Sequence, residues 1–140
     1  MSIGGGKITF HGPGQLIIYT MINTRKHSFN IRQLVTILEQ SVVHLLKKIG
    51  IKSFTKKDAP GVYINNSKIA SIGLRLKHGY TYHGLSLNID MDLTPFESIN
   101  PCGLKDISMA QISDFNEEYN LEKSAKNIVA FIKKNKKYYE

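Results

Sequence analysis

The sequence contains a single cysteine and no long uninterrupted run of apolar residues. One cysteine cannot form a disulfide within the chain, which is typical of proteins from a reducing compartment. No window approaches the roughly 18 consecutive apolar residues that a membrane-spanning helix requires. The first residues also lack the charged and apolar regions of a signal or transit peptide. We therefore expect a soluble protein of the cytoplasm that does not bind membranes.

Motifs for metal ions and nucleotides are missing as well. The cysteine and the histidines do not form the HxxH or CxxC spacing that brings two metal ligands together. The sequence has no GxxxxGKS/T motif, and the turn at Gly12-Pro13-Gly14 lacks the lysine and hydroxyl partners of a phosphate-binding loop. We expect neither a metal ion nor another cofactor.

Arginine is scarce although the chain is basic. Lysine and arginine together number 19 against 11 acidic residues, a formal charge of +8, yet only Arg25, Arg32 and Arg75 are arginines. A nucleic-acid surface would favour arginine, which makes paired contacts to phosphates and base edges, so we expect no nucleic-acid partner. The lysines within residues 133–137 are typical of a solvated helix end, while the overall charge would attract an acidic partner.

Two segments have the residue spacing of amphipathic helices. Apolar residues recur at intervals of three and four over Ile31–Ile49, with Asn30 placed to cap the start and Gly50 placed to end the helix. A second apolar stripe begins at Leu121 and is preceded by Asn120, a residue type that caps helix starts.

Strands are predicted where apolar and polar residues alternate or where short apolar runs are bounded by turns. Asn65-Asn66 is predicted to be the turn of a hairpin. The predicted strands are Lys7–Phe10, Leu16–Ile22, Gly61–Ile64, Ser67–Ile72 and Leu85–Ile89. We therefore predict one α+β domain over 1–140, in which two helices pack on a mostly antiparallel sheet.

Cys102 and Lys68 are the side chains best suited to chemistry. Cys102 lies between Pro101 and Gly103, which favour an exposed thiol over a buried one. A free cysteine titrates near about 8.5, so a thiolate at neutral pH needs a nearby cation or base. Lys68 stands in a short apolar strand, where a lysine is out of place unless it snorkels to solvent or is used. Taken alone, His11 and His83 are better explained as hydrogen-bonded structural residues.

Three motifs in order make the sequence resemble the octanoyltransferases, also called lipoate-protein ligase B. The first covers Gly5, Gly6 and the run from Thr9 to Leu16, which matches a glycine pair followed by T-Y/F-HGPGQL. The second is the lysine-bearing run KIASIGLR from Lys68 to Arg75. The third runs from His83 to Gly103 and matches HGL-x-LN-x-x-x-DL-x-x-F-x-x-I-x-PCG.

This resemblance implies a fold similar to the catalytic domain of biotin and lipoate ligases. It also implies transfer of an octanoyl group, in lipoate biosynthesis, from octanoyl-acyl carrier protein to a lysine of lipoyl domains. The acceptors would be lipoyl domains of 2-oxoacid dehydrogenases and the glycine cleavage H protein. In the family, the cysteine matching Cys102 carries the acyl group as a thioester. The lysine matching Lys68 lowers the pKa of that thiol and moves protons.

The resemblance further implies a substrate-binding site made from three segments. These are the glycine-rich stretch near the start of the chain, the segment that follows Lys68, and the HGL segment. The residues at these positions are Gly4, Gly5, Gly6, Lys7, Ile8, Thr9, Phe10, His11, Ser71, Ile72, Gly73, His83, Gly84, Leu85 and Ser86.

The sequence departs from the family pattern in two ways. Gly4 stands where the family has an arginine that helps to order the acyl site. Family members also carry a sizeable N-terminal portion before the first motif, so we expect the catalytic domain to be partial at its N-terminus. A start placed inside a longer coding region, a shortened functional form that self-associates, and an inactive remnant each fit this pattern.

Two other classes of function stay open. An ATP-dependent lipoate or biotin ligase would share the fold, but the PCG motif and the lack of an adenylate-binding loop speak against it. A non-catalytic fragment or binding module would fit the shortened start and the basic charge.

Overall fold

A computed structural model of the protein describes residues 2–3, 6–10, 14–19, 31–77, 80–90 and 108–136. Within these ranges, side chains are described for residues 14–18, 32–73, 84–90 and 108–135. The strands are β1 (Ser2–Ile3), β2 (Gly6–Phe10), β3 (Gln15–Tyr19), β4 (Phe54–Lys56), β5 (Ala59–Ile64), β6 (Ser67–Lys77), β7 (Tyr80–Asn88) and β8 (Ser108–Met109).

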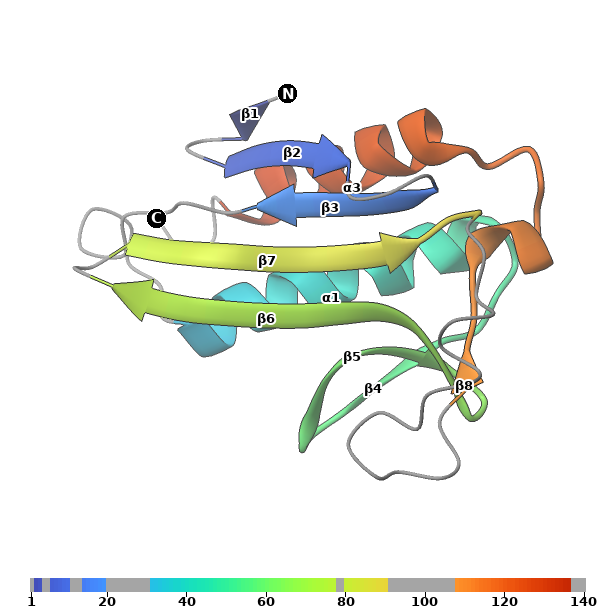
Figure 1. The fold of residues 1–140 in the computed structure, drawn as a ribbon, viewed down its shortest axis with the longest axis horizontal. Helices are drawn as coiled ribbons and strands as arrows, with labels where there is room; N and C mark the ends of the chain where they lie inside the picture. Colours follow the sequence, from blue (N-terminus) through green and yellow to red (C-terminus); the bar gives the residue numbers. More distant parts are fainter. Residues whose placement is uncertain are drawn as a thin grey trace.

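These eight strands, all within the described ranges, form one sheet (Figure 1). Their order is β1-β2-β3-β7-β6-β5-β4, and β8 pairs with β6 outside this path. Every pairing is antiparallel except the parallel pairing of β6 with β8. The mostly antiparallel sheet predicted from the sequence is confirmed.

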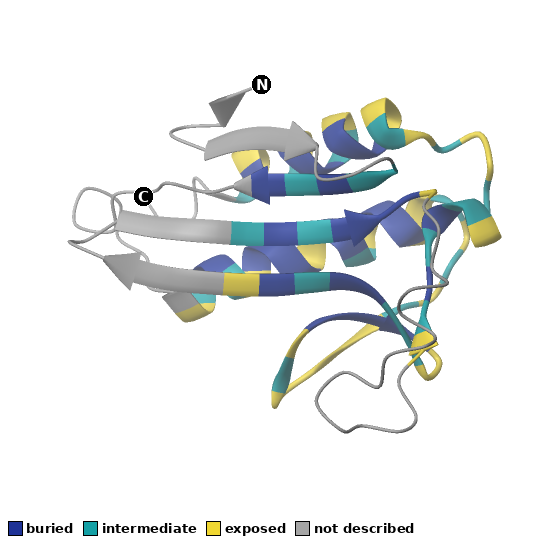
Figure 2. Cartoon of the chain, in the orientation of Figure 1, coloured by how far each residue is buried: buried dark blue, intermediate teal, exposed yellow. Residues whose placement is uncertain are grey.

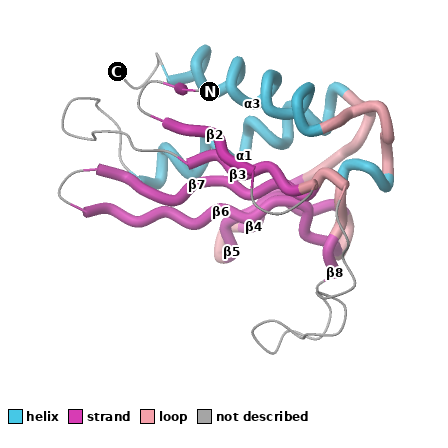
Figure 3. The backbone as a smooth tube through the Cα atoms, turned by 45° about the horizontal axis from the view of Figure 1, so that its top comes forward, coloured by secondary structure: helices cyan, strands magenta, loops and turns pink. Residues whose placement is uncertain are grey.

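Two α-helices, α1 (Ile31–Lys48) and α3 (Leu121–Lys136), pack on one face of the sheet. A short 3₁₀ helix, η2 (Ile112–Asp114), precedes α3. α1 contacts β5, β6 and β7, while α3 contacts α1 and β3. Figure 3 shows both helices on the same side of the strands. The described part of the chain places no helix on the opposite face of the sheet, which we call the open face.

Local sequence signals mark the end of α1 and the start of α3 as predicted. Gly50 follows α1 with φ +81°, the left-handed conformation that glycine adopts without steric cost. Its N–H donates to the Lys47 carbonyl, and the Ile51 N–H donates to the Leu46 carbonyl, which completes a Schellman motif. At the start of α3, Asn120 Oδ1 accepts the Lys123 N–H at 2.9 Å. Asn30, the predicted cap of α1, lies outside the described residues.

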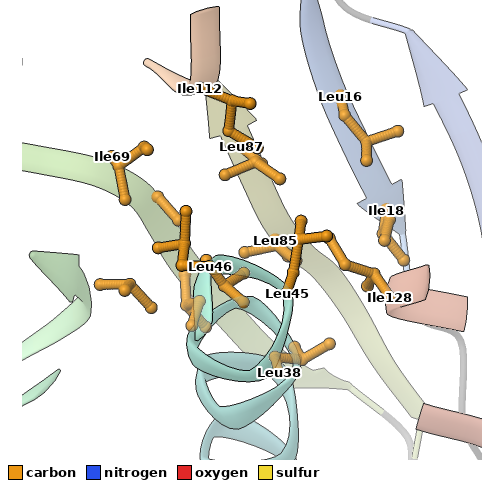
Figure 4. Close-up of a cluster of buried hydrophobic side chains, with 14 of the residues drawn as sticks. Leu16, Ile18, Leu38, Leu45, Leu46, Ile69, Leu85, Leu87, Ile112 and Ile128 are labelled. Atoms are coloured by element: carbon orange, nitrogen blue, oxygen red, sulfur yellow. The ribbon is translucent and has the colours of Figure 1, made fainter. Parts of the chain in front are cut away.

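The hydrophobic core lies between the sheet and the two helices (Figure 2). Leu38, Leu45 and Leu46 of α1 face the strands, and each is fully buried. Figure 4 shows Ile128 of α3 beside Ile18 of β3 in the same cluster. Each such side chain contributes about 1.5–3 kcal/mol through removal of apolar surface from water. The apolar stripe of each helix therefore determines which side of that helix packs against the sheet.

Three strands were not predicted, and the first of them is the two-residue β1. β4 is exposed at all three residues, so it lacks the alternation that marks a half-buried strand. β8 has only two residues and depends on its partner β6. The predicted strand at Leu16–Ile22 is found as Gln15–Tyr19, and residues 20–22 lie outside the described ranges.

Candidate functional site

The sheet brings the predicted binding segments together. β2 pairs with β3, β3 with β7, and β7 with β6, so strands distant in sequence become neighbours. Residues that pair with one another across successive strands form a row, and one such row is Ile8–Ile18–Leu85–Ile72. All three predicted segments therefore contribute a residue to this row, which faces the helices.

The next row faces away from the helices. Paired residues share a face of the sheet, and successive residues of a strand alternate between faces. Ile17 pairs with Ser86, Ser86 with Ser71, and Ser71 with Gly61. Because the neighbouring Ile18 row is buried against the helices, this Ile17 row lies on the open face.

Two glycines pair with each other in the following row of the open face. Gly73 pairs with Gly84 across β6 and β7. A Cβ atom built on Gly73 would meet no atom within 4 Å, and Gly84 has a φ of +158°. Gly73 therefore leaves space next to Ser71 on the open face.

Ile72 and Leu85 lie on the other side of the sheet. They are 9% and 1% exposed and belong to the core cluster against the helices. The resemblance implies that Ile72 belongs to the substrate-binding site, and the structure packs its side chain in the core. Ile72 and Leu85 can therefore reach a ligand on the open face only through their backbone.

Lys68 lies at the start of β6, where three strands meet. It pairs with Tyr63 of β5 and with Met109 of β8, and its carbonyl accepts the Ala110 N–H at 2.9 Å. The side chain is half-buried. Its Nζ lies 6.0 Å from the centre of the Tyr63 ring, and its Cε lies 2.9 Å from a Cβ built on Gly61. Since Gly61 pairs with Ser71, Lys68 borders the open-face row.

A buried carboxylate lies behind this lysine. Glu39 of α1 is 9% exposed, and its Oε2 accepts the Gly61 N–H at 3.0 Å. Burial raises the pKa of Glu39 above its ordinary value, and the hydrogen bond from Gly61 partly opposes this shift. Burial and the nearby Glu39 charge both raise the pKa of Tyr63. Tyr63 stays neutral at physiological pH, and its hydroxyl donates to the Ala59 carbonyl at 3.1 Å.

Sequence reasoning missed Glu39, Gly61 and Tyr63. The signal for Glu39 was available, because this carboxylate stands between Val35 and Val42 on the apolar side of the helix. In the sequence, Gly61 and Tyr63 carry only the signals of strand residues. Their relation to Lys68 depends on the pairing of β5 with β6 and on a bulge between Val62 and Tyr63.

Several predicted site residues are only partly described. Gly4, Gly5, His11 and Cys102 lie outside the described residues. The strand positions of Lys7, Ile8, Thr9 and Phe10 in β2 and of His83 in β7 are described, but their side chains are not. β8, the first described strand after Cys102 in the sequence, pairs with the start of β6 at Lys68.

The described part of the chain holds no group of three metal-binding side chains. It also contains no helix that is both long and apolar enough to cross a membrane.

Comparison with known protein families gives one match over most of the chain. The model of the lipoyl protein ligase A/B catalytic domain matches residues 2–133. The octanoyltransferase of Buchnera aphidicola subsp. Acyrthosiphon pisum (strain APS) is 53% identical over 118 residues, covering 84% of this chain and 56% of that protein. That of Haemophilus influenzae is 53% identical over 115 residues, covering 81% and 54%. The chain thus spans about half the length of these curated relatives.

Solved structures with this fold include two proteins of low sequence identity. The biotin protein ligase from Aquifex aeolicus has a TM-score of 0.73 at 19% identity, over 99% of this chain and 61% of that chain. P. falciparum LipL1, crystallised in complex with lipoate, has a TM-score of 0.63 at 15% identity, over 94% and 39%. These likenesses confirm the predicted α+β fold.

Proposed function

Since the chain belongs to the family of lipoyl protein ligase A/B catalytic domains, we propose that it transfers octanoyl groups to lipoyl domains. The donor is octanoyl-acyl carrier protein, and the intermediate is a thioester on Cys102. The observation that carries the proposal is the place of Lys68, half-buried beside the open-face row of Ser71 and Ser86. The named octanoyltransferases at 53% identity support the choice of acyl group.

The first step loads the enzyme. The Lys68 ammonium stabilises the Cys102 thiolate, because an opposite charge within a few ångströms lowers a thiol pKa. The thiolate attacks the carbonyl carbon of the octanoyl thioester, and the bond to the carrier's sulfur breaks. The carrier thiolate takes a proton from Lys68, which leaves octanoyl-Cys102 and a neutral Lys68 amine.

The second step delivers the acyl group. The amine of the acceptor lysine attacks the octanoyl-Cys102 carbonyl, and the neutral Lys68 amine takes the proton that its nitrogen loses. The carbon–sulfur bond breaks, an amide forms on the acceptor, and Cys102 leaves as a thiolate. Lys68 is again an ammonium beside it, so the cycle closes without ATP or a metal ion.

The open face offers a place for the acyl chain. Gly73 leaves space next to Ser71, and Ile17 adds a half-buried apolar side chain to the row of Ser71 and Ser86. An extended acyl chain lying across these positions would displace water from exposed backbone and from apolar side-chain surface. No cofactor is needed for this binding mode.

A non-catalytic form of the same fold is the second candidate. It is favoured by one observation, namely that the chain spans about half the length of the octanoyltransferases it matches. Such a form would fold and bind acyl carrier protein without forming a thioester.

Mass spectrometry of the intact full chain separates these candidates. Incubation with octanoyl-acyl carrier protein should add one octanoyl mass to Cys102, and Cys102→Ala should abolish it. A folded chain that gains no mass would support the non-catalytic form. A parallel reaction with free octanoate and ATP tests the ligase class, and acylation of a lipoyl domain only in that reaction would overturn the proposal.

A further inference from the structure

The stem of Lys68 lies against the backbone of Gly61. A Cβ atom built on Gly61 would lie 2.9 Å from Lys68 Cε and 2.7 Å from the Ala70 carbonyl oxygen. Both separations are shorter than real Cβ contacts, and the Gly61 φ of +152° is one that other residues rarely adopt. Lys68 Cε belongs to a flexible side chain, whereas the Ala70 carbonyl belongs to the backbone. A side chain at Gly61 would therefore displace the Lys68 stem, and its contact with the Ala70 carbonyl would remain unless β5 moved relative to β6.

Glu39 holds the Gly61 backbone from the opposite side. Its Oε2 accepts the Gly61 N–H at 3.0 Å, and the carboxylate is 9% exposed. A hydrogen bond to a carboxylate is stronger than one between neutral groups, and it strengthens further where water is excluded. This contact ties β5 to α1 at the residue on which the Lys68 stem rests.

Lys56 and Lys68 both lie near the ring of Tyr63. The Tyr63 hydroxyl lies 3.6 Å from the Cβ built on Gly61. Lys56 Nζ lies 4.2 Å from the centre of the Tyr63 ring, and Lys68 Nζ lies 6.0 Å from the same centre. Both cations therefore lie within about 6 Å of one aromatic ring, the range in which cation–π attraction acts. These contacts place four titratable groups near Gly61, namely Glu39 of α1, Tyr63 of β5, Lys56 of β4 and Lys68 of β6.

We propose that Gly61 and Glu39 are positioning residues that set where Lys68 presents its amine to Cys102. Glu39 fixes the Gly61 backbone, and the absence of a side chain at Gly61 lets the lysine stem lie flat across β5. The inference rests on the proposed function for the role of Lys68. It adds that neither residue touches the substrate and that both act through the lysine.

The pH dependence of thiol alkylation tests this proposal without any acyl transfer. Cys102 is the only cysteine in the chain, so the rate of iodoacetamide labelling against pH reports its thiol pKa directly. We expect the wild-type pKa to lie below about 8.5 and Lys68→Ala to raise it by about one unit or more. Gly61→Ala should raise it by part of that shift. In the Lys68→Ala background, Gly61→Ala should cause no further rise.

Matched variants separate positioning from loss of fold. Gly50 also has a positive φ, but a Cβ there meets nothing within 4 Å, so Gly50→Ala should lower stability without moving the thiol pKa. If Gly61→Ala does not fold, Glu39→Met replaces it, because it removes the acceptor of the Gly61 N–H. Glu39→Met should also raise the thiol pKa of Cys102. Glu39→Gln keeps an acceptor and should raise this pKa by less.

An alkylation profile of folded Gly61→Ala or Glu39→Met that coincides with wild type would overturn the inference. An equal shift in the presence and absence of Lys68 would do the same. The octanoyl adduct on Cys102 is measured separately, so failure of the proposed function would not be mistaken for failure of the positioning role.

Discussion

The side-chain amide of Asn88 donates a hydrogen bond to the backbone carbonyl of Ala110 at 3.1 Å. Its Oδ1 accepts a second hydrogen bond from Gln15 Nε2 at 3.1 Å. Asn88 is 2% exposed, so these partners replace water for both ends of its amide. One side chain at the end of β7 thus joins β3 to the segment that follows β8. This bridge gives a structural reason for the asparagine in the HGL-x-LN motif.

Loss of the Asn88 bridge should destabilise the fold. We expect Asn88→Ala to lower the free energy of unfolding by about 1–3 kcal/mol, because the buried Ala110 carbonyl loses its donor. Urea unfolding measures this as a lower midpoint. Gln40, exposed on α1, is the control, since Gln40→Ala should stay within about 0.5 kcal/mol of wild type. Equal midpoints for the two variants would argue against a bridging role.

The contact of α1 with the sheet should depend on Leu38. This side chain is fully buried, so Leu38→Ala should cost about 2–5 kcal/mol through lost burial and the cavity left behind. Phe115 is 47% exposed, and Phe115→Ala should cost less than about 1 kcal/mol. Thermal or urea unfolding of both variants gives the comparison. A larger loss at Phe115 than at Leu38 would show that the core has been misplaced.

Glu39 should make stability fall as pH rises. Its folded-state pKa is raised above the ordinary value of 4.5, chiefly by burial. A carboxyl with a raised folded pKa contributes its full stability below the unfolded pKa and loses it as pH rises through the folded pKa. Glu39→Gln removes this dependence. The unfolding free energy of the variant relative to wild type should therefore increase from pH about 4 to pH about 7, and a constant difference would be inconsistent with a buried, ionising Glu39.

The helices and most strands could be predicted because their signals are local. The apolar spacing over Ile31–Ile49 determines which side of α1 is buried, and Asn65 takes a φ of +53° in the two-residue turn expected at that hairpin. β4 could not be predicted, because its exposed residues carry no alternation. The pairing of β3 with β7 could not be predicted from local patterns either, because it joins residues more than 60 positions apart.

The site was predictable by residue type but not by arrangement. Lys68 stood out as a charge in an apolar strand, and the structure places it half-buried at the junction of β5, β6 and β8. Which binding residues share the open face depends on strand register, which a local pattern leaves undetermined. The same limit hid Gly61, whose importance is visible only through the Lys68 stem that crosses it.

The charge of +8 should accelerate the encounter with an acidic carrier protein. Attraction between exposed charges is screened over about 10 Å at 0.1 M salt, so acylation of Cys102 by octanoyl-acyl carrier protein should slow as salt rises. A small uncharged octanoyl thioester is the matched donor, and its rate should change little. Parallel salt dependence for both donors would rule out steering by the protein's charge.

Movement of a single octanoyl group through Cys102 is the most direct test of the whole account. The full chain is first loaded with octanoyl-acyl carrier protein, separated from the donor, and then mixed with a lipoyl domain while both masses are followed. We predict that the octanoyl mass leaves Cys102 and appears on one lysine of the lipoyl domain, and that Lys68→Ala slows both steps. A folded, loaded chain that keeps its octanoyl group, or a lipoyl domain acylated equally well by Cys102→Ala, would contradict it.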